Sequence, residues 1–106
     1  MEILLVSHNL ITRSQLEGTW RRAGADVTAA PGARTPDLIC VDLNLEDAPE
    51  RIRDLRTRCP EARILAFGPH VDAGAFKAAR AAGADGGVAR GKIAERVLGM
   101  IGERAR

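Results

Sequence analysis

Three polar side chains that could do chemistry follow two apolar runs of this 106-residue chain. Asp42 comes directly after residues 38–41, and Ser7 and His8 come directly after residues 2–6. Apolar runs without polar alternation are typical of parallel strands that are covered on both faces. Because parallel strands end at the same edge of a sheet, we expect these side chains at the carboxyl edge, where ligands collect in open α/β sheets.

The residues leave the chemistry of this edge open. The Asp42 carboxylate could be a functional anion site, act with His8 as a metal ligand or proton carrier, or be a structural group that is hydrogen-bonded to Arg90 or to backbone. A Ser–His–Asp triad is disfavoured, because adjacent Ser7 and His8 side chains point apart on an extended chain. No phosphate-binding glycine motif follows a strand. A small ligand-binding or enzymatic α/β domain that uses this edge therefore stays an alternative.

Length and composition predict one folded domain over residues 1–106. A hydrophobic fraction of 45% favours a globule over a disordered chain. No apolar run approaches the roughly 20 residues of a membrane span, and no signal peptide opens the chain, so we expect a cytoplasmic protein without membrane contact. Cys40 and Cys59 form no zinc or redox motif and are expected to be reduced thiols.

The charge pattern argues against a nucleic-acid partner. The net charge is +2, and the 14 arginines alternate with aspartate and glutamate without forming a basic run. This pattern predicts solvated helix faces that carry ion pairs. Three aromatic residues also offer little surface for base stacking.

Strand and helix signals alternate along the chain, which predicts a doubly wound parallel sheet with right-handed connections. Strands are expected at residues 2–6, 27–30, 38–41, 63–67 and 87–90. Helices are expected after Asn9, from Pro49 to Cys59, from Asp72 to Ala82 and from Ile93 to Glu103, with Gly24 and Gly83 as C-terminal caps. The inner face of the first helix is expected to carry Leu10, Ile11, Leu16, Trp20 and Ala23.

The connection between the second and third strands is unusually short. Only residues 31–35 separate Ala30 from Pro36, whereas a parallel crossover ordinarily takes a dozen or more residues. Five or six extended residues reach at most roughly 20 Å, so they must cross the sheet as bare chain. We expect this to leave apolar surface open on one face, and such a patch commonly marks a partner or self-association site. A protein partner or a homodimer is therefore expected.

Three stretches resemble response-regulator receiver (CheY-like) domains, and together they extend the resemblance over nearly the whole chain. They are residues 6–27, with Val6-Ser7-His8-Asn9 and Ala23-Gly24-Ala25-Asp26-Val27 at their ends, residues 36–44, and residues 81–86. The resemblance implies a flavodoxin-like five-stranded parallel sheet in the order 2-1-3-4-5. It also implies about four helices, because the second helix of the family is missing here.

The resemblance also assigns positions at the carboxyl edge. Asp42 takes the phospho-acceptor position, and Asn44 takes the position whose backbone carbonyl joins the metal shell. The other receiver-pocket positions differ from the family pattern: the acidic pair is replaced by Ser7 and His8, the phosphate-sensing hydroxyl by Gly68, the lysine by Arg90, and the aromatic switch by Gly87.

These departures predict a degenerate pseudo-receiver, a stand-alone signalling module that acts through protein–protein contacts and is not an enzyme. Magnesium needs several hard oxygen ligands, and Asp42 alone supplies few. No other cofactor is implied. By resemblance, the docking face carries Lys77, Arg80, Arg90 and Lys92. The alternative is a functional phospho-acceptor that a histidine kinase phosphorylates on Asp42 with Mg²⁺ as cofactor.

Overall fold

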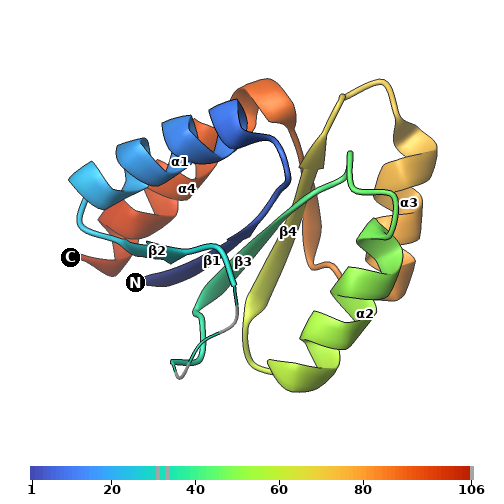
Figure 1. Cartoon of the computed structure of the whole chain (residues 1–106), viewed down its shortest axis with the longest axis horizontal. Coiled ribbons are helices and arrows are strands. Elements are labelled where there is room, and N and C mark those ends of the chain that lie inside the picture. Colours follow the sequence, from blue (N-terminus) through green and yellow to red (C-terminus); the bar gives the residue numbers. More distant parts are fainter. Residues whose placement is uncertain (31, 33, 106) are drawn as a thin grey trace.

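A parallel five-stranded sheet forms the centre of the molecule, in the order β2-β1-β3-β4-β5 (Figure 1). The computed structural model describes residues 1–30, 32 and 34–105. The strands are β1 (Glu2–Val6), β2 (Asp26–Thr28), β3 (Leu38–Asp42), β4 (Arg63–Gly68) and β5 (Gly86–Ala89). The helices are α1 (Leu10–Arg22), α2 (Ala48–Arg58), α3 (Ala73–Ala82) and α4 (Ile93–Arg104), and a 3-10 turn (Arg90–Lys92) precedes α4.

The predicted topology is confirmed, since every pair of neighbouring strands is parallel and β2 lies at the edge. Several strand ends differ from the prediction by one or two residues. Strand β2 ends at Thr28 instead of continuing to Ala30, and Arg90 starts the 3-10 turn instead of ending β5. Between β2 and β3 the described residues contain no helix, as predicted. Pro31 and Ala33 of the predicted bare-chain crossover lie outside the described residues.

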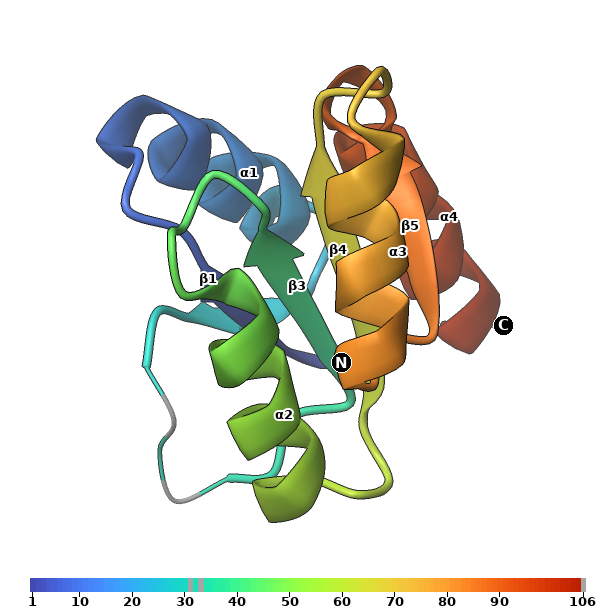
Figure 2. The same cartoon turned by 90° about the vertical axis from the view of Figure 1, so that its right-hand side faces the viewer.

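Helices cover both faces of the sheet, which explains why β3 is buried along its whole length. Helices α1 and α4 lie on one face, and α2 and α3 lie on the other (Figures 1 and 2). Trp20 of α1 is fully buried in the first layer, and Ile52 of α2 is fully buried in the second. None of the helices in the described part of the chain has the length and hydropathy that a membrane crossing needs.

Local signals fix the helix ends as predicted. Asn9 Oδ1 accepts a hydrogen bond of 2.9 Å from the Thr12 amide, and Asp72 Oδ1 accepts one of 3.1 Å from the Ala75 amide. These side chains satisfy amides that have no partner inside the helix. At the other ends Gly24 has a φ of +100° and Gly83 a φ of +125°, a region that glycine adopts without strain.

The predicted inner face of α1 is wrong at both ends. Ala23 lies just past the last helical residue and is exposed, and the first turn also differs from the prediction. Leu16 and Trp20 are buried, but Leu10 is 74% exposed and Ile11 is 72% exposed. At about 100° of rotation per residue, Leu10 and Ile11 project well away from the direction of Leu16. The first turn of α1 therefore presents apolar side chains to solvent.

The open apolar patch predicted beside the missing helix is also wrong as a broad exposed face, because the apolar side chains of β1 on this side are largely buried. Leu4 and Val6 face this side of the sheet and are only 2% and 7% exposed. Strand β2 turns Val27 into the α1/α4 layer, while Asp26 and Thr28 are exposed. The large apolar side chains that are exposed lie elsewhere, at Leu10, Ile11 and Val71. A polar edge strand thus limits the expected apolar surface to hollows beside β1.

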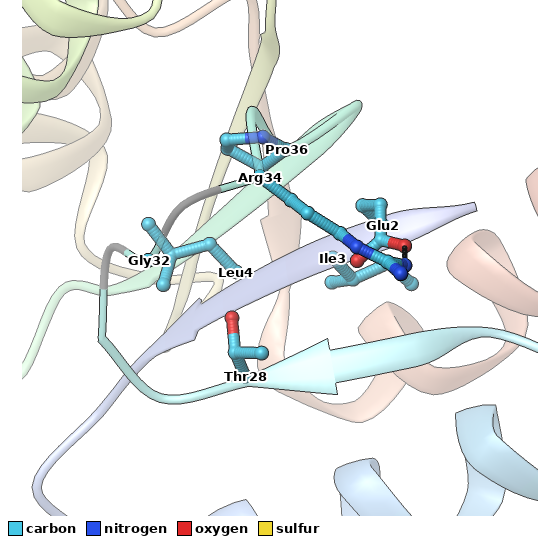
Figure 3. A pocket seen from close by; sticks show the side chains of 7 residues that line it. All are labelled: Glu2, Ile3, Leu4, Thr28, Gly32, Arg34 and Pro36. Carbon is cyan, nitrogen blue, oxygen red and sulfur yellow. Dashed lines mark hydrogen bonds and ion pairs between the residues drawn. The ribbon is translucent and has the colours of Figure 1, made fainter.

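Two hollows remain on this side. The smaller one has a volume of about 150 Å³ and lies beside β1 and β2, where Leu4, Thr28 and Pro36 line it (Figure 3). Arg34 crosses it and forms a 2.7 Å ion pair with Glu2 (Figure 3). The larger hollow lies between α2 and the residues that follow β2.

The Arg56 side chain ties the end of α2 to the connection between α3 and β5. Its guanidinium donates to the carbonyls of Gly83 (2.9 Å) and Ala62 (2.7 Å) and to the Asp85 carboxylate (2.7 Å). Asp85 also accepts a 2.8 Å hydrogen bond from the Ile64 amide at β4. One side chain therefore satisfies groups from two separate connections, the one between α2 and β4 and the one between α3 and β5.

Replacing Arg56 with alanine should remove these hydrogen bonds and leave partly buried carbonyls without a donor. We expect the free energy of unfolding to fall by about 1–3 kcal/mol, measured by urea denaturation. Arg58→Ala is the matched control, because Arg58 forms an exposed ion pair with Asp54 on the same helix, and we expect a change within about 0.5 kcal/mol. Equal losses in the two variants would contradict the role of Arg56.

Candidate functional site

The ends of β1, β3 and β5 bring Ser7, Asp42 and Arg90 together at the carboxyl edge of the sheet. Asp42 is the last residue of β3, Ser7 directly follows β1, and Arg90 directly follows β5. The Asp42 side chain is only 2% exposed, although it lies at a strand end. A charge in such a place must be compensated by partners, because removing a carboxylate from water is costly.

Both carboxylate oxygens of Asp42 accept two hydrogen bonds. Oδ1 accepts from the Arg90 Nη2 (2.5 Å) and from the Asn44 amide (3.0 Å). Oδ2 accepts from the Ser7 hydroxyl (2.8 Å) and from the Arg90 Nη1 (3.3 Å). The Ser7 oxygen in turn accepts from the Asn9 amide at 3.2 Å, which orients the hydroxyl toward Asp42. The hydrogen bond to Arg90, one of the arrangements that the sequence left open, is therefore present.

Arg90 reaches Asp42 by crossing the intervening strand β4. Its guanidinium carbon lies 5.3 Å from the centroid of the Phe67 ring, within the range of a cation–π contact. The two-pronged contact with the carboxylate adds charge-assisted hydrogen bonds in a fixed geometry, which a lysine could not reproduce. With 31% of its side chain exposed, Arg90 closes the site from the solvent side.

The pKa of Asp42 lies below its ordinary value of 3.8, as the result of opposing causes. Burial is the largest single cause and raises the pKa of this carboxyl. The hydrogen bond from Arg90, the hydrogen bonds from the Asn44 amide and Ser7 hydroxyl, and the Arg90 charge lower the pKa and together outweigh burial. Asp42 is thus an ionised carboxylate whose charge is balanced inside the protein.

The other predicted positions do not join this cluster. His8 is exposed and, in the described part of the chain, makes no hydrogen bond to Ser7 or Asp42, so the triad is not assembled. It instead lines an open hollow of about 520 Å³ together with Asn44 and Asp47. Cys40 and Cys59 are free thiols in the core, and burial strongly raises the pKa of Cys40.

Two glycine positions are filled by side chains from neighbouring segments. A Cβ at Gly68 would lie 3.1 Å from the Leu43 Cβ, so a serine or threonine there would require Leu43 to shift. A Cβ at Gly87 would lie 2.3 Å from Phe76 Cδ1, because the Phe76 ring of α3 packs over this strand. The sequence analysis missed Phe76 and Leu43. The glycines themselves were the only available signal, since they mark places where another group can approach closely.

The donor set at this edge does not fit a magnesium ion. Ser7 and His8 supply no carboxylate, and the four hydrogen bonds to Asp42 already engage both of its oxygens. Magnesium prefers near-octahedral oxygen ligands, including one or two carboxylates. Among the described residues no group of three or more His, Cys, Asp or Glu side chains could hold a metal ion.

No protein-family model and no curated protein sequence matches the chain. Solved structures do. The receiver domain of the TMAO respiratory system response regulator TorR has a TM-score of 0.77 at 24% identity, over 96% of this chain and 97% of that chain. The Vibrio cholerae chemotaxis protein CheY4 has a TM-score of 0.79 at 19% identity, over 96% of each chain. The chain has the receiver fold.

A third similar structure is a response regulator protein from Burkholderia pseudomallei, described with a phosphorylated aspartic acid, a calcium ion and citrate. Its TM-score is 0.81 at 26% identity, and the match covers 92% of this chain and 64% of that one. These receiver structures confirm the fold and strand order that the resemblance implied. At this level of identity they do not transfer a residue's role.

Replacing Arg90 with glutamine should leave the Asp42 carboxylate buried without its charge partner. We expect the free energy of unfolding near neutral pH to fall by about 3 kcal/mol. The lowered pKa of Asp42 means that the stabilisation from this pair is present above pH 3.8 and is lost as the pH falls through the lowered value. The difference between wild type and Arg90→Gln should therefore shrink on acidification.

Urea denaturation at several pH values measures this difference. The double variant Asp42→Asn, Arg90→Gln is the control, because it removes both charges and should recover part of the loss. A difference that stays constant from neutral to acid pH would show that Arg90 stabilises the fold without acting through the Asp42 charge.

Proposed function

We propose that this chain is an atypical receiver-like signalling module that acts through protein–protein contacts and does not use magnesium-dependent phosphorylation. The observation that carries the proposal is the two-pronged Arg90–Asp42 ion pair, which engages both oxygens of the phospho-acceptor position. Receiver-fold structures such as that of TorR support signalling as the general function.

The ion pair opposes phosphoryl transfer to Asp42 for two reasons. An attacking carboxylate oxygen must first leave its hydrogen bonds to Arg90, Ser7 or Asn44. The product would then place about two negative charges at a site without carboxylate ligands for a neutralising divalent cation. Arg90 instead provides a built-in positive charge, so the site is already neutralised in its resting state.

The parts that would convert a phosphate into a conformational change are also replaced. Gly68 offers no hydroxyl, and Leu43 packs where a side chain on that residue would lie. At Gly87 the Phe76 ring of α3 fills the space that a side chain would occupy, so this position of β5 has no side chain that could rotate. A fixed surface therefore fits these observations better than a phosphorylation-driven switch.

The docking surface that we propose is the groove between α3 and β5. It has a volume of about 570 Å³, with Phe76 and Gly87 among its lining residues. The charged and titratable side chains that line it are His70, Lys77 and Arg80, and no acidic residue joins them. Cationic walls around an aromatic residue suit an acidic segment of a protein partner in the cytoplasm.

Two alternatives keep a structural basis. Arg90 approaches Asp42 from the solvent side, so its displacement could uncover a phospho-acceptor for a histidine kinase, with Mg²⁺ as cofactor. The open hollow of about 520 Å³ beside His8 could hold a small ligand and would favour a binding or enzymatic domain at the Ser7/His8/Asp42 edge.

Beryllofluoride, which mimics an aspartyl phosphate, separates the proposal from the phospho-acceptor alternative. We expect the amide resonances of Asp42 and its neighbours to stay unshifted when Mg²⁺ and beryllofluoride are added, because Arg90 and Ser7 hold the carboxylate. The control is the variant Ser7→Asp, His8→Asp, Arg90→Lys, which supplies carboxylates for the cation and should respond. A response of the wild type that saturates at Asp42 would overturn the proposal.

A further inference from the structure

The side of the sheet without a crossover helix contains a groove that the proposed function does not use. Helix α2 contacts β3, α3 contacts β4 and β5, and α1 contacts β2 from the opposite face. Among the described residues no helix lies between β2 and β3, so no crossover helix covers the α2 side of β1 and β2. Between α2 and residues Ala29 and Ala30 lies a hollow of about 400 Å³.

The groove has an apolar floor and an acidic rim. Leu4 and Val6 of β1 and Leu55 of α2 lie at its base and are largely buried, and the exposed Ala29 and Ala30 line one wall. The N-cap and the helical turns of α2 form the rim. It carries the carboxylates of Asp47, Glu50 and Asp54 and the guanidinium of Arg51.

The rim is more acidic than the molecule around it. Asp47 pairs with Arg51 at 3.1 Å and Asp54 pairs with Arg58 at 3.2 Å, while Glu50 makes no ion pair within the described residues. A negative groove on a chain of net charge +2 is a local reversal of sign. Such a reversal favours partners of opposite charge and disfavours like-charged ones.

The negative charge of the rim distinguishes between the partners that could occupy the groove. In a two-fold dimer through this groove, the Asp47, Glu50 and Asp54 rims of two copies would face each other, and like charges would repel. A nucleic acid or an anionic membrane is disfavoured for the same reason. An arginine or lysine side chain matches both parts of the groove, because its methylene stem can lie against Ala29 and Ala30 while its charged head reaches the rim.

We propose that this groove binds an arginine- or lysine-rich segment of another protein, which takes the place that a crossover helix would fill. The inference does not depend on Asp42 or on the α3–β5 groove. A failure here would therefore leave the proposed function standing, and the reverse also holds.

The experiment titrates the ¹⁵N-labelled full chain with an arginine–leucine peptide and, separately, with its glutamate–leucine counterpart. We expect amide shifts confined to Leu4, Val6, Ala29, Ala30 and the exposed face of α2, with the cationic peptide only. The variant Glu50→Lys, Asp54→Lys should weaken binding by about tenfold, and added salt should weaken binding to the wild type.

The matched control compares peptide binding by Glu50→Lys with binding by Glu103→Lys. The second variant makes the same charge change at an exposed site of α4, on the opposite face of the sheet. Equal weakening in both variants would mean unspecific attraction and would overturn the proposal. Shifts that map to the α3–β5 groove, or no binding of the cationic peptide, would overturn it as well. Sedimentation of the wild type tests the other occupant: a dimer that Glu50→Lys alters would assign the groove to a second copy instead.

Discussion

The carboxyl edge of this molecule depends on the compensation of one buried charge. Asp42 is held away from water by the strands around it, and an ionised carboxylate in that place is stable only if its oxygens find donors. Ser7, Asn44 and Arg90 supply these donors, and Phe67 supports the Arg90 guanidinium from below. The ion pair spans β4 and thereby links β3 to the end of β5.

At two glycines near this edge, side chains from neighbouring segments fill the available space. Packing density in a protein interior leaves few voids, so a lost side chain must be replaced by another group. Leu43 packs against Gly68, and the Phe76 ring packs against Gly87. At each glycine, a side chain from a neighbouring segment therefore fills the space that a side chain of that residue would occupy. The result is a carboxyl edge that is closely packed around the Asp42–Arg90 ion pair.

The edge strand β2 shows how the fold tolerates the short connection between β2 and β3. Losing a helix would expose apolar side chains on β1 and β2, yet β2 presents Asp26 and Thr28 to that side and turns only Val27 inward. The surface that remains beside α2 is a hollow with an apolar lining and an acidic rim instead of a flat apolar face. The alternation of exposed and buried side chains over the three residues of β2 thus keeps this side of the edge strand polar.

The sequence by itself determined the order and type of the elements. Unbroken apolar runs gave buried parallel strands, Asn9 and Asp72 began helices, and Gly24 and Gly83 ended them, because these signals act between residues that are close along the chain. The position of Asp42 at a strand end followed from the same local pattern. Arg90 was recognised only as one of several partners for that carboxylate.

Tertiary structure decided everything that depends on which distant residues meet. Only strand order and packing show that Arg90 passes over Phe67 to Asp42, that Phe76 covers Gly87, and that Leu10 and Ile11 project into solvent. These contacts join residues from separate elements, and their geometry depends on side-chain rotamers and on the angle at which each helix lies on the sheet. Periodicity along the chain carries no information about either.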